Sequence, residues 1–266
     1  TYGWEVKQND RFTERLQSQL KAPGGKRTES VNAGVISYSP VLSYLQYKHH
    51  LYVLDPDLVV LSFDMSDLQD HQTYKKHTVF DQQGRPLFCQ EKTLGQSRGS
   101  VPDLLFFRWM GIGKAHSAFI EARGRYDWTR DGESKDWASE AQEALMPVKH
   151  LADLLKFNDI ALVLATYPQP WQAHPEATPW LREGLGVGEN RIHTEDRAFQ
   201  IIEEFAMHHG IAYVNATPAF RAYPQATRLY FQENVHFTPK GHAVYAAALG
   251  KFLRKAFDEY SFSWAE

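Results

Sequence analysis

The 266-residue chain has one cysteine, Cys89, so no disulfide can form within it. It also has no apolar run near the ~20 residues of a membrane-spanning helix, because its longest runs, 58–63 and 160–165, have only the length of strands. Lysine and arginine are scattered and the net charge is −3, so we expect no nucleic-acid partner. The sequence therefore predicts a fold that depends on a packed core.

Patterns typical of metal and nucleotide sites are also missing. The histidine pairs 49–50 and 208–209 have no Cys, Asp or Glu at metal-ligand spacing, and adjacent helix residues do not face one ligand. The glycine clusters at 111–113 and 184–188 follow no apolar run, unlike the glycines of dinucleotide-binding turns. We therefore expect no metal ion and no organic cofactor.

What the sequence does contain is an alternation of helix and strand patterns. Apolar runs predict strands at 58–63, 160–166 and 211–214, and a further short strand is expected to end at Asn32. Amphipathic or capped segments predict helices at 10–20, 40–53, 134–156, 194–209 and 238–257. This alternation favours an α/β fold with a doubly wound parallel sheet, a flavodoxin-like three-layer α/β/α arrangement whose site lies at the carboxyl ends of the strands.

One stretch does not fit the alternation. Residues 72–136 show little periodicity and are too many for a simple loop in a compact domain. We therefore expect an insertion with some structure of its own, within a single domain that spans residues 1–266.

Four short blocks, taken in order, resemble the SGNH/GDSL hydrolase family. The first is Thr1-Tyr2-Gly3-Trp4-Glu5-Val6, which looks like the continuation of that family's Gly-Asp-Ser-Phe motif. On this alignment the nucleophilic serine falls two positions before Thr1. The strand that leads to it, central in the family's sheet, also falls there. The resemblance thus implies that the strand ending at Asn32 and the strand 58–63 do not pair directly.

The second and third blocks imply an oxyanion-binding site. Val31-Asn32-Ala33-Gly34-Val35 is similar to the family's Asn-x-Gly, where the glycine N–H helps to hold the developing oxyanion. The segment 56–68 is similar to Pro-Asp-x-Val-Val-Leu followed by Gly-x-Asn-Asp, with Asp64 in the glycine position and Ser66 in place of the asparagine. Gly34 and Ser66 are thus the candidate oxyanion donors, although a turn glycine and a strand-end polar residue would look the same.

The fourth block carries the candidate catalytic pair. Glu233-Asn234-Val235-His236 precedes Phe237-Thr238-Pro239-Lys240-Gly241-His242, which resembles Asp-x-x-His before a helix start in the family. In that family the carboxylate orients the histidine, and the histidine removes the proton of the serine. Here Glu233 replaces the aspartate. We expect Glu233 and His236 to lie within hydrogen-bond reach, and Gly34, Ser66 and His236 to share one cleft.

Together the blocks imply an ester hydrolase, or an O-acyltransferase of the same chemistry. The implied substrates are small acyl esters such as acetyl groups, including those on carbohydrate, with His236 and Glu233 serving an upstream serine. The alternative is a non-catalytic carbohydrate-binding or scaffolding protein that retains the fold. The presence of Ser66 in place of the family's asparagine, and of Glu233 in place of its aspartate, favours this alternative. The sequence that precedes Thr1 distinguishes the two.

Overall fold

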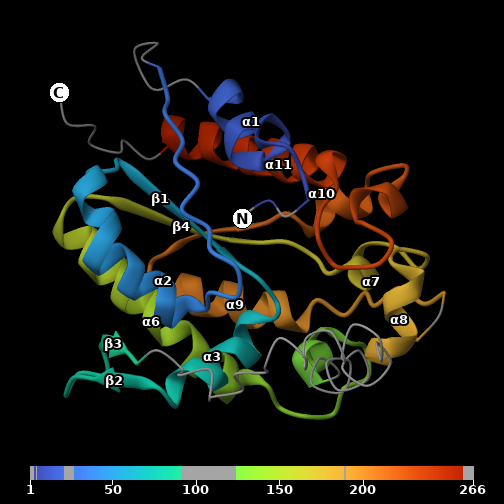
Figure 1. Cartoon of the computed structure of the whole chain (residues 1–266), viewed down its shortest axis with the longest axis horizontal. Helices are drawn as coiled ribbons and strands as arrows, with labels where there is room; N and C mark the ends of the chain where they lie inside the picture. The colour runs from blue at the N-terminus through green and yellow to red at the C-terminus, as the bar shows by residue number, and fades with distance from the viewer. Residues whose placement is uncertain (1–2, 4, 21–26, 91–123, 189, 260–266) are drawn as a thin grey trace, which may run out of the picture.

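The computed structural model describes residues 3, 5–20, 27–90, 124–188 and 190–259. At its centre lies a parallel sheet of β1 (Leu58–Phe63), β4 (Ala161–Thr166) and β5 (Ala212–Asn215), in the order β1-β4-β5 (Figure 1). The ladder between β1 and β4 runs from Leu58↔Ala161 to Phe63↔Thr166 without interruption. The three strands expected from the long apolar runs are thus confirmed, and their carboxyl ends meet at one edge.

Helices cover both faces of this sheet. On one face α2 (Pro40–Gln46), α6 (Ala138–Phe157) and α9 (Arg197–His208) pack with strand residues that include Phe63, Leu162 and Leu164. On the other face α1 (Phe12–Gln19) and α11 (Pro239–Glu259) pack with Val163, Ala165 and Val214. The strand side chains alternate between the two clusters because successive residues point to opposite faces. The expected three-layer α/β/α arrangement is confirmed.

Strand β1 is covered like an interior strand but is paired like an edge strand. Its side chains contact both helical layers, Val59 and Leu61 on one face and Leu58 and Val60 on the other. Its ladder runs along one side only, to β4, and among the described residues no strand pairs with its other side.

The strand expected to end at Asn32 does not form, so that prediction is wrong. Residues 28–34 have no strand assignment, and Val31 is 59% exposed. The carboxamide of Asn32 accepts the N–H of Gly34 at 3.0 Å, which closes a local turn in place of a ladder. An isolated extended segment has no neighbour to satisfy its backbone and gains little from β-propensity alone. This segment and β1 do not pair, as expected.

The irregular stretch 72–136 has structure in the part that is described. Helix α3 (Asp67–Lys75) runs into it and is followed by a hairpin of β2 (Thr78–Phe80) and β3 (Pro86–Cys89). The short helix η5 (Gly124–Thr129) ends it, while residues 91–123 lie outside the described part. The hairpin was missed because strands of three and four residues give almost no periodic signal.

The remaining elements are short helices that connect the layers. They are η1 (Gln8–Asp10), η3 (Tyr47–Leu51, a π-helix), η4 (Tyr52–Leu54), α7 (Pro170–Ala173), α8 (Pro179–Leu185), α10 (Thr217–Arg221) and η6 (Ala226–Leu229). The helix expected at 40–53 is thus α-helical only to Gln46 and then changes type. Of the helices described, none is both long and apolar enough to cross a bilayer.

Candidate active site

A carboxylate lies at the carboxyl end of β1 and gathers polar groups from β4. Asp64 directly follows β1, whereas Tyr167 and Gln169 follow β4. The hydroxyl of Tyr167 donates to Asp64 Oδ2 at 2.8 Å, and Gln169 Nε2 donates to the same oxygen at 3.3 Å. Asp64 Oδ1 accepts the backbone N–H of Ser66 at 2.8 Å. Three donors therefore fix the carboxylate of Asp64 at the edge where a doubly wound sheet carries its site.

Tyr167 joins this carboxylate to the loop before α11. Burial, and secondly the charge of Asp64, raise the pKa of the Tyr167 hydroxyl well above its usual value, so the hydroxyl remains a donor. The ring packs edge-on against Phe237, with centroids 4.8 Å apart, and against Tyr245 at 5.2 Å. Because Phe237 follows His236, the tyrosine places the histidine loop next to the end of β1.

His236 stands on a loop that is held by Asn234. The side chain of Asn234 accepts the N–H of His236 at 2.9 Å and donates to Glu5 at 3.2 Å. Burial lowers the pKa of His236 from its ordinary value, while the charges of Asp64 and then Glu5 raise it. The net shift of the pKa is downward, which favours the neutral imidazole that a general base requires.

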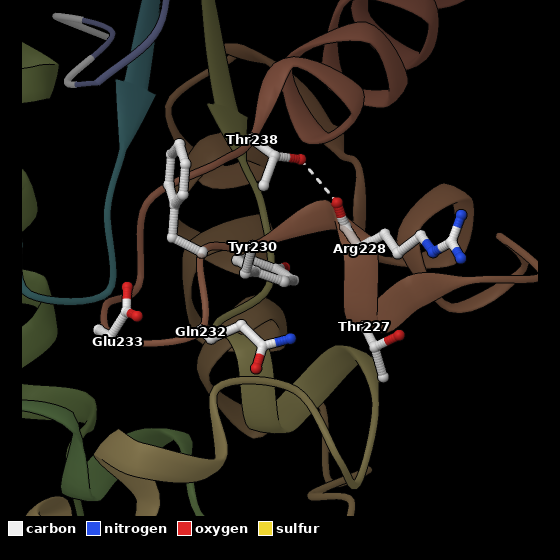
Figure 2. A pocket seen from close by; sticks show the side chains of 7 residues that line it. Thr227, Arg228, Tyr230, Gln232, Glu233 and Thr238 are labelled. Atoms are coloured by element: carbon white, nitrogen blue, oxygen red, sulfur yellow. Dashed lines mark hydrogen bonds between the residues drawn. The ribbon is translucent and has the colours of Figure 1, made fainter.

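The beginning of α11 is locked to the segment before it. Tyr230 forms an isolated bridge with Phe237, and Thr238 Oγ1 donates to the carbonyl of Arg228 at 2.6 Å (Figure 2). A Cβ on Gly241 would lie 2.2 Å from the Leu229 carbonyl oxygen, so only glycine allows this contact. The block 233–242 thus leads into a helix that begins at Pro239, as the sequence predicted.

Glu233 is exposed and lines a surface pocket of about 420 Å³. Figure 2 shows Glu233 and Arg228 on opposite sides of this pocket. The other lining residues are Thr227, Tyr230, Phe231, Gln232 and Thr238. The hydrogen bond expected between Glu233 and His236 stays a prediction.

The two candidate oxyanion donors have partners in the structure. Ser66 is buried at the start of α3, where it acts as a side-chain hydrogen-bond partner of Asp70 and Tyr126. The N–H of Gly34 donates to the Asn32 side chain. Ser66 shares its surroundings with Asp64, at the end of the sheet where His236 lies. The convergence of Gly34 on the same cleft stays a prediction.

Two further acidic side chains, Asp67 and Asp70, lie close to Asp64. The N–H of Asp64 donates to Asp67 Oδ2 at 3.1 Å, and Arg125 forms an ion pair with Asp70. Burial, and then the neighbouring charges of Asp64 and Asp70, raise the pKa of Asp67 well above its usual value. Among the residues described, no group of three or more His, Cys, Asp or Glu side chains is placed to hold a metal ion.

Comparison with known proteins finds similarity only at the level of structure. No family model and no curated protein matches the chain. A catalytic mutant of Axe2, an acetylxylan esterase from Geobacillus stearothermophilus, aligns over 96% of this chain and 84% of its own, with 12% identity and a TM-score of 0.48. A GDSL-like lipase from Bacteroides thetaiotaomicron aligns over 81% of this chain and 99% of its own, with 15% identity and a TM-score of 0.33.

The GDSL-like lipase is of the kind that the four sequence blocks resemble. At TM-scores below 0.5 these structures support no conclusion about catalysis in this chain, so the roles of its residues are inferred from its own geometry.

Sequence reasoning missed three residues of the site. Asp64 stands in the glycine position of the third block, where the resemblance gives it no role, and Tyr167 and Gln169 follow the predicted strand 160–166 outside all four blocks. A usable signal was present, because all three directly follow buried strands whose carboxyl ends share one edge. That they converge on one carboxylate depends on the alignment of β1 with β4, which the sequence does not give.

Proposed function

We propose that the protein is a serine ester hydrolase or an O-acyltransferase acting on small acyl esters, among them acetyl esters of carbohydrate. The observation that carries the proposal is His236. Its imidazole lies on a braced loop at the carboxyl edge of a parallel sheet, near the fixed carboxylate of Asp64, and its pKa is lowered from the ordinary value. A histidine in these surroundings is suited to take up a proton and to release it again.

In the proposed reaction, a serine hydroxyl supplied by the sequence before Thr1 loses its proton to His236 as its oxygen attacks the acyl carbonyl. The ester C–O bond then breaks, and the departing alcohol takes the proton from His236. Water, or the hydroxyl of a sugar, attacks the acyl-enzyme in the same way and releases the serine. Glu233 is the loop carboxylate assigned by spacing, and Gly34 and Ser66 would exchange their present partners for the oxyanion.

Turnover of 4-nitrophenyl acetate by the natural protein, including the sequence that precedes Thr1, tests this proposal. We expect His236→Ala to lower kcat/KM by roughly 10³–10⁶, the range seen when a member of a catalytic triad is lost. His50→Ala is the matched control, because His50 is exposed and lies in the π-helix away from the strand ends. Weak turnover in the natural protein that His236→Ala leaves unchanged would instead support the non-catalytic binding protein.

A further inference from the structure

We infer that Asp64 is a positioning residue, the carboxylate that stabilises the His236 imidazolium during the reaction. The inference rests on the proposed function and names a residue that the sequence motifs did not assign. It differs from the spacing argument, which gave this role to Glu233.

The first support is that Asp64 is fixed before any substrate binds. Tyr167, Gln169 and the N–H of Ser66 donate to its two oxygens, and its own N–H donates to Asp67. The three groups that donate to it come from the end of β4 and the start of α3, so the direction of the carboxylate is set by the edge of the sheet. A carboxylate held in this way stabilises a neighbouring positive charge at little cost of reorganisation. Glu233, by contrast, is exposed on a loop.

The second support is the connection between Asp64 and the histidine loop. Tyr167 donates to the carboxylate and packs on Phe237, the residue that follows His236. Two carboxylates raise the pKa of His236 by their charge, Asp64 first and Glu5 second. Glu5 is exposed and already accepts from Asn234, so solvent screens its charge more strongly than that of half-buried Asp64.

The third support is the arrangement of the acids around Asp64. Asp67 accepts the N–H of Asp64, and Asp70 is paired with Arg125. Burial raises the pKa of Asp67, so this residue favours its neutral form and repels the charge of Asp64 less. With Asp67 neutral and Asp70 paired, Asp64 is the charged carboxylate of this cluster that stabilises the His236 imidazolium.

The test is the pH dependence of kcat/KM for 4-nitrophenyl acetate in the natural protein. Its acid limb reports the titration of the general base in the free enzyme. Because the charge of Asp64 raises the pKa of His236, Asp64→Asn should move the acid limb to lower pH, by about one unit, and lower the plateau at least ~10-fold. Asp64→Glu, which keeps the charge, should leave the limb near its original position. Asp153→Asn, an exposed change on α6, is the control for activity.

Glu233→Gln is the decisive comparison. A shift of the acid limb in Glu233→Gln, with none in Asp64→Asn, would overturn the inference and leave the proposed function intact. Failure of the proposed function itself would be seen separately, as activity that survives His236→Ala. If Asp64→Asn does not fold, Asp64→Ser, a smaller neutral side chain that can still accept from Tyr167, must show the same downward shift. An unmoved limb in that variant contradicts the inference.

Discussion

The hydroxyl of Tyr167 donates to the carboxylate of Asp64 at 2.8 Å, and this one contact joins the ends of two neighbouring parallel strands. The same tyrosine ring packs on Phe237, so the contact also fixes the loop that carries His236. The pair therefore connects the stability of the sheet edge with the geometry of the proposed site.

Tyr167→Phe should destabilise the protein without disturbing its packing. The ring contacts with Phe237 and Tyr245 remain, but the carboxylate loses a donor, and a hydrogen bond to a charged group contributes about 1.5–3 kcal/mol. Urea unfolding at pH 7 measures the change. Tyr213→Phe is the matched comparison, since that hydroxyl is hydrogen-bonded to neutral Thr166 at 2.8 Å and should cost about 1 kcal/mol. Equal losses in the two variants would contradict the charge-assisted role of Tyr167.

Asp67→Asn should stabilise the protein at neutral pH. Burial raises the pKa of Asp67, so the stability that its protonated form contributes is complete below pH ~3.8 and is lost as the pH rises through the folded-state pKa. An asparagine oxygen can still accept the N–H of Asp64 and carries no charge to desolvate. The advantage should therefore be present in urea unfolding at pH 7 and shrink toward pH 4. A variant less stable than the natural protein at pH 7 would show that the charged form of Asp67 stabilises the fold.

Gly241→Ala should be strongly destabilising, because its Cβ would meet the Leu229 carbonyl oxygen at 2.2 Å and Phe237 Cβ at 2.9 Å. Backbone would have to move, which typically costs about 1–3 kcal/mol. Gly250→Ala in the same helix is the control. Its Cβ would meet, at 3.2 Å, the flexible ends of Arg254 and Gln19, and helix propensity favours alanine by about 1 kcal/mol. Similar changes in the midpoint of thermal unfolding in both variants would contradict the close packing of α11 on Leu229.

His242→Gln should weaken the acid sensitivity of the fold. The N–H of Phe12 donates to His242 Nδ1 at 3.3 Å, and burial lowers the pKa of His242 to about 4. Histidine in the unfolded chain titrates near pH 6.5, so between pH 6.5 and 4 only the unfolded chain takes up this proton. The free energy of unfolding therefore decreases as the pH is lowered through this range. Glutamine keeps an acceptor but does not titrate. The slope of unfolding free energy against pH should therefore fall by up to about 1.4 kcal/mol per pH unit. An unchanged slope would contradict the neutral, buried state of His242.

The sequence predicted the core of the fold because its signals are local. The runs at 58–63 and 160–166 are apolar on both faces, which is what a strand between two helical layers requires. The segment ending at Asn32 carried a weaker pattern, and a strand forms only where a neighbour supplies a ladder. In its absence the Asn32 side chain closes a turn with Gly34 instead.

The candidate site was predicted only where one segment contains it. The histidine and its helix start lie within ten residues, so the spacing was informative. Asp64, Tyr167 and Gln169 come from two segments about one hundred residues apart and meet through the register of β1 with β4. No local pattern encodes that meeting, so the carboxylate of Asp64 and the groups that hold it could be found only in three dimensions.

Covalent labelling by a serine-directed organophosphonate tests the central claim, that His236 activates a serine for acyl transfer. The natural protein, with the sequence preceding Thr1, should gain one phosphonyl group by mass spectrometry, on a serine in that preceding sequence. His236→Ala should abolish the labelling while His50→Ala retains it. Absence of labelling in the natural protein, or labelling that persists at the same rate in His236→Ala, would contradict the account.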